Sequence, residues 1–259
     1  MFTKEQTEKY LARIGLVGPL ALKWETLNQI VWAHYTHVPY ENLDTMNQIP
    51  VLLSEEALYD KIVNRHRGGW CFELNAGLAL LLEGLGFLVT RLAARFVMGE
   101  APGSIPLRRH EVLLVELEDG QYVCDAGIMR ESYRAALKLE HGSVQPDGIG
   151  EYMIKAHPFY GNLILQRLEK DMFEPLMGFT LEPQTPGDYI MPSFYCEHHP
   201  DSPFTHHRMV GVYTNDGSIN LVGNELRWIS QGKVSQRREC EEEEIPGVLR
   251  EYFGIEGIK

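Results

Sequence analysis

The chain has no apolar run that reaches the roughly 18 residues needed to span a membrane. Its first six residues, MFTKEQ, are mostly polar and lack the apolar segment of a secretion signal. We therefore expect a cytoplasmic protein with no membrane partner.

Cysteines and cations are both scarce. The four cysteines among 259 residues are widely spaced and form no C-x-x-C pair, which predicts free thiols in a reducing compartment. The 24 lysines and arginines are outnumbered by 36 acidic residues, which gives a net charge of −12. This balance argues against a nucleic-acid partner. It is compatible with an anionic cofactor, since binding such a cofactor requires only a local basic patch.

The rest of the composition is that of a globular protein, with 44% hydrophobic and 23% charged residues. Apolar residues recur at helical spacing in the first third of the chain and at strand spacing in the middle third. The last third mixes strand patterns with a final helix. This order predicts an α+β fold. Helices are expected from about residues 3, 22, 54 and 71, and strands at 87–98, 110–117, 122–125, 161–167, 178–182, 208–213 and 218–222.

One cysteine stands where a nucleophile would be useful. Cys71 follows Gly68, Gly69 and Trp70 and opens an apolar helical run that ends near Gly86. A thiol at a helix N-terminus feels the positive end of the helix dipole, which favours the reactive thiolate. The two glycines permit a sharp turn and close approach of a substrate. A buried, inert structural cysteine fits the same local pattern.

A cysteine nucleophile requires a base and a group that orients the base. His110 begins one predicted strand, and Asp125 ends the next, just before a glycine turn. Taken singly, each residue fits an ordinary structural role better, His110 as a surface strand residue and Asp125 as a turn cap. Together with Cys71 they form a candidate Cys-His-Asp triad.

The hairpin between these two strands decides whether the candidates meet. A loop formed by Asp119-Gly120 leaves His110 roughly 13 Å along the strand from the residue opposite Asp125, too far for a hydrogen bond. A loop displaced to Glu118-Asp119 sets Val112 opposite Asp125 and brings His110 to the diagonal position. A β-bulge would also shift the pairing. The local pattern does not choose among these arrangements.

Several segments, in order along the chain, resemble the arylamine N-acetyltransferase family. The resemblance extends from about residue 5 to residue 255, and its Arg-Gly-Gly-Trp-Cys segment is specific. The matching segments are VPYENL at 38–43, HRGGWC at 66–71, His110 with its apolar strand, VCDAG at 123–127, FTLEP at 179–183 and HPDSPFT at 199–205.

The resemblance implies that Cys71, His110 and Asp125 are the catalytic triad. It implies ping-pong transfer of an acetyl group from acetyl-CoA, through a thioester on Cys71, to the nitrogen of an arylamine or arylhydrazine. It also implies a three-part fold with a core like that of the cysteine proteases. The expected parts are a helical bundle carrying the nucleophile at 1–86, an antiparallel β-barrel carrying His110 and Asp125 at 87–190, and an α/β lid at 191–259.

Further positions are implied for the acceptor side. Tyr40 and Ile128 match positions that line the acceptor pocket and commonly hold phenylalanine in the family, and Arg109 is assigned to the same side. Arg67 and Glu41 are expected to form a structural ion pair beneath the site.

The donor side carries its own implied contacts. The family match places them at Pro106, Leu107, Ser202, Phe204 and Thr205. The pyrophosphate of the donor has several basic candidates, which are also ordinary surface residues: Arg108, Arg109, His206, His207 and Arg208.

The histidines between positions 198 and 207, with Cys196, suggest zinc, but their spacing fits no standard structural site. Pro200 and Pro203 also interrupt any single helix there. We therefore expect no metal and acetyl-CoA as the acyl-donor substrate.

Other classes of protein fit part of the pattern. A Cys-His-Asp triad also serves an amide hydrolase or a transglutaminase-like enzyme. A natural-product amide synthase of the same family would share every motif, and a non-enzymatic binder could retain the scaffold. The sequence does not predict the physiological acceptor, the range of acyl chains or the oligomeric state.

Overall fold

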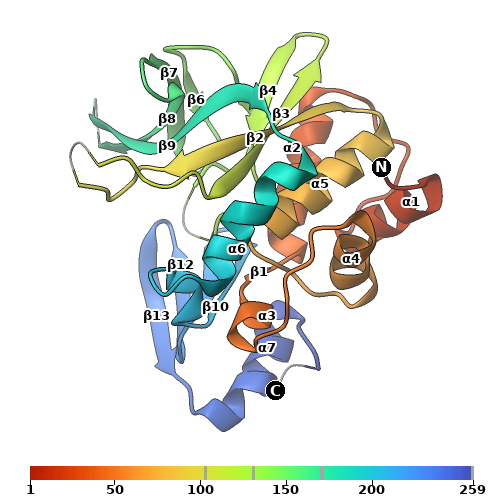
Figure 1. Cartoon of the computed structure of the whole chain (residues 1–259), viewed down its shortest axis with the longest axis vertical. Helices are drawn as coiled ribbons and strands as arrows, with labels where there is room; N and C mark the ends of the chain where they lie inside the picture. Colours follow the sequence, from red (N-terminus) through yellow and green to blue (C-terminus); the bar gives the residue numbers. More distant parts are fainter. Residues whose placement is uncertain (102–103, 130–131, 170–171, 258–259) are drawn as a thin grey trace.

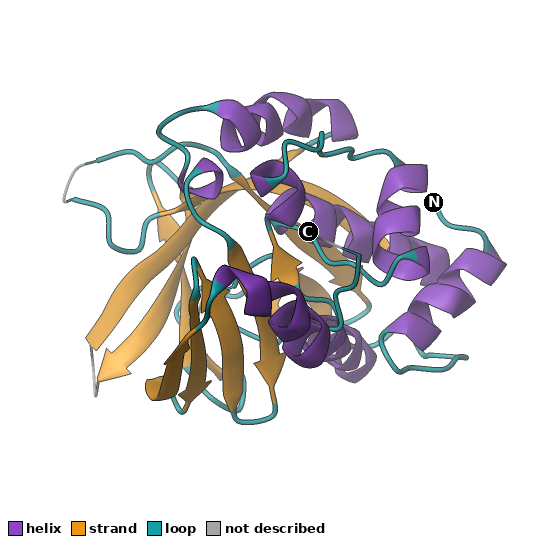
Figure 2. Cartoon of the chain, turned by 90° about the horizontal axis from the view of Figure 1, so that it is seen from below, coloured by secondary structure: helices purple, strands orange, loops and turns teal. Residues whose placement is uncertain are grey.

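The computed structural model describes residues 1–101, 104–129, 132–169 and 172–257. It combines N-terminal helices, a large antiparallel sheet and a smaller sheet flanked by helices, which confirms the predicted α+β class (Figure 1). Seen from below, most of the helices gather to one side of the strands (Figure 2). No helix in these four ranges combines the length and apolar character required to cross a bilayer.

Local capping chemistry sets the start of the first helix. The Thr3 hydroxyl accepts a hydrogen bond from the Gln6 backbone at 3.3 Å, and the Gln6 side chain accepts from the Thr3 backbone at 2.9 Å. Threonine followed three residues later by glutamine is the sequence pattern of such a reciprocal capping box. The N-terminal helical elements are α1 (Lys4–Arg13), α2 (Trp24–His37), α3 (Leu43–Met46), α4 (Glu55–Tyr59), the π-helical turn η1 (Asp60–Asn64) and α5 (Cys71–Leu85).

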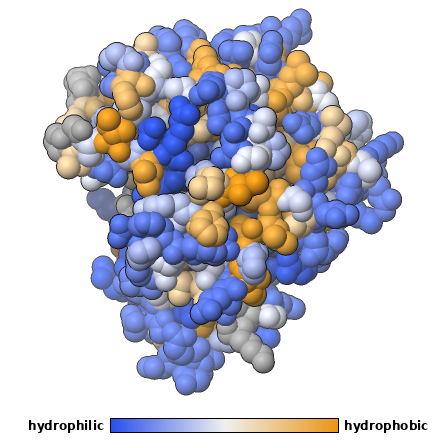
Figure 3. All heavy atoms as spheres, viewed as in Figure 1, coloured by the Kyte–Doolittle hydropathy of each residue, from blue (hydrophilic) through white to orange (hydrophobic). Residues whose placement is uncertain are grey.

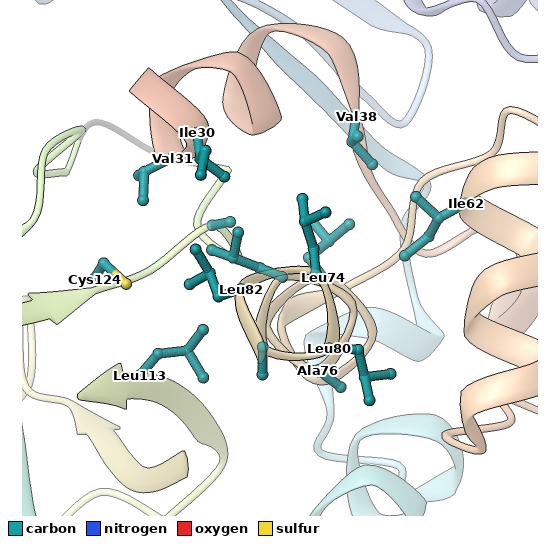
Figure 4. Packing of buried hydrophobic residues seen from close by; sticks show 14 of the residues in the cluster. Ile30, Val31, Val38, Ile62, Leu74, Ala76, Leu80, Leu82, Leu113 and Cys124 are labelled. Atoms are coloured by element: carbon teal, nitrogen blue, oxygen red, sulfur yellow. The ribbon is translucent and has the colours of Figure 1, made fainter. Parts of the chain in front are cut away.

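Helix α5 is the buried centre of this region. Every residue from Cys71 to Leu82 is buried, so the helix has no solvent face along that stretch. Figure 4 shows its Leu74, Ala76 and Leu82 among side chains from neighbouring elements, including Leu113. The helix ends at Gly86, which adopts φ +98°, a conformation that glycine tolerates best. This packing leaves Cys71 little freedom to move.

The eight-stranded sheet curls into a nearly closed barrel. Its strand order is β5-β4-β3-β2-β9-β8-β7-β6, and all neighbouring strands are antiparallel. Strand β7 was not predicted from the sequence. The strands are β2 (Leu88–Phe96), β3 (His110–Leu117), β4 (Gly120–Cys124), β5 (Leu137–Lys138), β6 (Val144–Pro146), β7 (Glu151–His157), β8 (Gly161–Glu169) and β9 (Met172–Pro183).

The second sheet joins the two ends of the chain. Its order is β1-β10-β11-β12-β13, and β1 (Tyr40–Glu41) comes from the N-terminal third. Tyr40 also bridges to Gly69, so the residues just before Cys71 are tied through β1 to the C-terminal region. The other elements are β10 (Met209–Thr214), β11 (Gly217–Val222), β12 (Glu225–Ser230), β13 (Lys233–Glu239), the helices α6 (Ile190–His198) and α7 (Ile245–Phe253), and the 3₁₀ turns η2 (Pro186–Tyr189), η3 (Pro203–Thr205) and η4 (Glu242–Glu244).

Candidate active site

Cys71 is the first residue of α5, directly after the extended residue Trp70. The Glu73 carboxylate accepts a hydrogen bond from the Trp70 backbone at 3.1 Å and so holds the first turn. The Cys71 side chain is buried, and its Sγ lies 3.8 Å from the backbone oxygen of Arg109. The thiol therefore sits beside the residue that precedes His110.

His110 and Asp125 form a buried pair. The His110 Nε2 lies 2.5 Å from the Asp125 Oδ2, and neither side chain is exposed to solvent. The other ring nitrogen, Nδ1, is buried and has no hydrogen-bond partner in the described part of the chain. One ring nitrogen of His110 is thus held by a carboxylate, while the other nitrogen remains available for proton exchange.

The register of the β3–β4 hairpin answers the question left by the sequence. Glu116 pairs with Gln121 and Leu113 with Cys124, so the next position sets Asp125 opposite Val112. The loop is therefore the displaced one at Glu118-Asp119, and the alternative prediction of a loop at Asp119-Gly120 is wrong. The displaced register brings the two side chains into contact.

Asn75 is a part of the site that the sequence analysis missed. Its Nδ2 donates to the Asp125 Oδ1 at 2.8 Å and to the Glu111 backbone oxygen at 2.7 Å, while its Oδ1 accepts from the Ala126 backbone at 2.8 Å. The position lies four residues after Cys71, on the same face of α5, and that spacing was the available signal. Asn75 ties the nucleophile's helix to the strands that carry His110 and Asp125.

Three glycines permit close packing around Cys71. A Cβ on Gly127 would lie 2.6 Å from the Cys71 Cα, and a Cβ on Gly68 would lie 1.7 Å from the Pro39 backbone oxygen. A Cβ on Gly69 would likewise meet the Glu73 side chain. Neither residue 68 nor residue 69 has a positive φ. Their expected role in a sharp turn is therefore replaced by close contact between segments.

A buried ion-pair network lies beneath the first turns of α5. Arg67 contacts Glu41 at 2.7 and 2.8 Å, which is the pair expected from the sequence, and it also contacts Asp44 at 2.9 Å. Lys61 continues the network to Asp44 at 2.7 Å and to Glu73 at 2.6 Å. The sequence analysis did not predict the two contacts of Lys61, because they join elements that are distant along the chain.

The environment of the thiol opposes the expected thiolate. Burial raises the pKa of Cys71 well above its ordinary value, and the neighbouring Cys196, Asp125 and Glu111 add to the increase. A hydrogen bond from the Phe72 backbone acts in the opposite direction but is the smaller effect. The expected lowering by the helix N-terminus alone is therefore outweighed by burial. Ionisation of this thiol requires a partner that takes its proton.

The predicted acceptor-side residues lie close to this thiol or in the barrel. Tyr40 is buried, and burial, followed by the nearby Cys71, raises the pKa of its phenol. Ile128 is buried in the apolar cluster inside the barrel, together with Tyr133. The Arg109 guanidinium has no hydrogen-bond or ion-pair partner among the described residues.

The predicted donor-side residues fall in two segments. Pro106 is buried, and its backbone oxygen accepts a hydrogen bond from Arg95, while Leu107 is half-exposed. In the second segment Ser202 is buried and donates to the Cys196 backbone oxygen at 2.6 Å.

The remaining two donor-side residues follow Ser202 directly. The ring of Phe204 meets Trp70 edge-on at 5.5 Å, which places the segment beside the nucleophile's helix. The Thr205 hydroxyl donates to the Ser202 backbone oxygen at 2.9 Å.

The histidine-rich segment makes separate local contacts. The ring of His199 stacks on Tyr195 at 4.3 Å, and the His206 ring lies 2.5 Å from the Pro200 backbone oxygen. Across the described ranges, no group of three or more histidine, cysteine or acidic side chains is arranged to hold a metal ion. The expected absence of a metal stays a prediction.

Comparisons with known proteins agree with this geometry. A family model described as N-acetyltransferase matches residues 23–257. The arylamine N-acetyltransferase of Mycolicibacterium smegmatis is 37% identical over 251 residues, which cover 95% of this chain and 90% of that protein. The Escherichia coli arylamine N-acetyltransferase is 31% identical over 95% of this chain and 87% of its own length.

Solved structures show the same relationship. The arylamine N-acetyltransferase from Salmonella typhimurium superposes with a TM-score of 0.92 at 28% identity, over 98% of this chain and 92% of that one. The Mycobacterium marinum enzyme in complex with CoA gives a TM-score of 0.87 at 31% identity, over 95% and 92%. The family match, the near-complete coverage and the shared fold together show that this chain belongs to the arylamine N-acetyltransferase family.

Proposed function

We propose that this protein transfers an acetyl group from acetyl-CoA to the nitrogen of an arylamine or arylhydrazine through a thioester on Cys71. By family it is an acyltransferase. One observation carries the assignment to these residues. The buried thiol at the start of α5 lies 3.8 Å from the backbone oxygen of Arg109, and the next residue, His110, has its Nε2 held by Asp125 and its Nδ1 without a partner among the described residues.

In the first half-reaction the Cys71 thiol gives its proton to the His110 Nδ1, and the resulting imidazolium stabilises the thiolate that burial disfavours. The sulfur forms a bond to the acetyl carbonyl carbon, and the bond from that carbon to the CoA sulfur breaks. His110 returns its proton to the departing thiolate. The first backbone N–H groups of α5 have no partner within the helix, so those of Cys71 and Phe72 are suited to stabilise the oxyanion.

In the second half-reaction the amine nitrogen attacks the acetyl carbon. Its proton passes to His110, the bond from the carbon to Sγ breaks, and the proton then returns to the sulfur. Asp125 keeps the imidazole in the required orientation and tautomer throughout and stabilises its cation. Asn75 and the Gly127 backbone both donate to the Asp125 Oδ1, at 2.8 and 2.7 Å, and so hold the carboxylate itself.

We assign Tyr40, Arg109 and Ile128 to the acceptor side. On the donor side we assign Pro106, Leu107, Phe204 and Thr205. The hydroxyl of Ser202 is buried and already bonded, so its part is to shape the loop that presents the following residues.

We keep residues 1–86, 87–190 and 191–259 as the three functional parts. We also propose that the protein acts in the cytoplasm without a nucleic-acid partner. Four free thiols and a net charge of −12 support this.

The intermediate tests the proposal directly. Acetyl-CoA without acceptor should add one acetyl group to Cys71, detected by intact-protein mass and peptide mapping and released by hydroxylamine. An arylamine chase should then remove the label and yield the N-acetyl product. Labelling of Cys124, Cys196 or Cys240 instead, or turnover by Cys71→Ala, contradicts the assignment. An amide hydrolase would be acylated by peptides or esters in preference to acetyl-CoA, so the same panel separates the two classes.

A further inference from the structure

A cavity of about 190 Å³ opens on the sheet at the meeting of β2 and β9. Its lining includes two arginines and three aromatic residues, namely Arg95, Arg108, Phe159, Tyr160 and Phe179. In the view of Figure 3 a strongly hydrophilic patch lies over β2, bordered by apolar surface. None of the mechanistic steps above uses this cavity.

The cavity is on the same face of the sheet as α5. Leu92 and Ala94 of β2 point into the barrel, so Ala93 and Arg95 point to the opposite face, because side chains alternate along a strand. On that face Leu113 of the neighbouring strand packs with the residues of α5. The cavity therefore lies on the outer face of the barrel sheet, against which α5 also packs.

The side chains around the cavity carry more positive than negative charge. The Arg95 guanidinium donates to the Pro106 backbone oxygen and lies 6.0 Å from the centre of the Phe159 ring, without a carboxylate partner in the described ranges. Arg108 donates to the Thr180 hydroxyl at 3.2 Å and lies 3.4 Å from the exposed carboxylate of Glu182. Burial, and then the charge of Arg108, lower the pKa of Arg95. Two cations thus face one space with a single solvent-exposed counter-ion.

We propose that Arg95 and Arg108 bind a phosphate group at the nucleotide end of the acyl donor. Guanidinium groups match phosphate oxygens in geometry and are less strongly hydrated than ammonium groups. The donor is the ligand because Arg95 is hydrogen-bonded to Pro106, an expected contact of its pantetheine arm, and Arg108 lies two residues before His110. The ring of Phe159, which is 52% exposed, lies beside the Arg95 guanidinium. This inference rests on the proposed acetyl transfer and adds the recognition of its donor.

Two donors test the site. Acetyl-CoA and acetyl-pantetheine carry the same thioester, but only the former carries phosphates. We expect Arg108→Gln to lower the ratio of kcat/KM for acetyl-CoA to that for acetyl-pantetheine about tenfold, mainly through KM. Arg95→Lys should lower it less than Arg95→Gln, because it keeps the charge. Arg167→Gln is the matched control, since Arg167 lies on the same sheet over Phe173 at 4.6 Å and should leave the ratio unchanged.

A merely structural role for either arginine would slow both donors equally and leave the ratio unmoved, which overturns the proposal. A raised KM for an acidic acceptor with an unchanged acetylation half-reaction also overturns it, because the cavity would then serve the acceptor. If acetyl-CoA does not acetylate the wild-type protein, the proposed function itself is wrong. This experiment is therefore done before any variant is made.

Discussion

Two polar clusters meet at the first turns of α5, and they differ in how completely their polar groups are paired. In the proposed catalytic cluster, formed by Cys71, Asn75, His110 and Asp125, the amide and the carboxylate are hydrogen-bonded, and one imidazole nitrogen has no partner among the described residues. The ion-pair network described above instead joins each of its charged groups to an opposite charge. A cluster that transfers a proton needs a proton acceptor that is not already hydrogen-bonded within the protein. A cluster that supports a helix is most stable when every charge is paired.

The largest expected effect comes from breaking the catalytic cluster at its carboxylate. Asp125→Asn keeps the shape but removes the charge that stabilises the imidazolium and sets its tautomer. We expect the acetylation rate to fall on the order of 10³- to 10⁴-fold. Stopped-flow release of CoA measures this rate, and the melting temperature should change little. A loss below tenfold would show that His110 does not depend on Asp125.

The ion-pair network should respond in the opposite way. Lys61→Met leaves the Glu73 and Asp44 carboxylates buried without their shared cation, so we expect roughly 3–5 kcal/mol lower stability toward urea. Activity per folded molecule should fall far less than for Asp125→Asn. Lys9→Met, which removes an exposed pair with Glu5, is the control and should leave stability nearly unchanged. If Lys61→Met unfolds no more easily than this control, the network is not structural.

The pH dependence of thiol alkylation separates the two influences on Cys71. Burial raises its pKa, so without a proton acceptor the thiol is protonated at neutral pH and its thiolate fraction rises tenfold per pH unit. We expect this steep rise in His110→Ala. The wild-type protein should alkylate faster and with little pH dependence across neutrality, because His110 takes the proton. Identical steep profiles for both proteins would refute a Cys71–His110 pair.

The smallest expected effect concerns acceptor selectivity. Ile128 is buried inside the barrel, and Ile128→Phe adds a ring face for stacking at the expense of space. We expect relative kcat/KM values among aryl acceptors to change several-fold, with little change in the acetylation half-reaction. Equal slowing of both half-reactions would place Ile128 outside the acceptor side.

Local sequence determined much of this protein. The capping box at Thr3 and the whole of β3 follow from short-range chemistry and periodicity, and both agree with the structure. The strands β12 and β13 and the helix α6 were not predicted. β13 is exposed along its whole length and so lacks an alternating apolar pattern, while α6 lies just before Pro200 and Pro203. Weak or interrupted periodicity explains these omissions.

The candidate site divides in the same way. The sequence made Cys71, His110 and Asp125 candidates in combination, and the resemblance to the family implied that they form the triad. Only the tertiary structure decided that the last two touch, since a one-residue difference in the hairpin loop moves His110 into or out of reach. It alone supplied Asn75 and the ion-pair partners, and it reversed the expected pKa shift of the thiol. Those properties depend on burial and on contacts between distant segments, which no local pattern encodes.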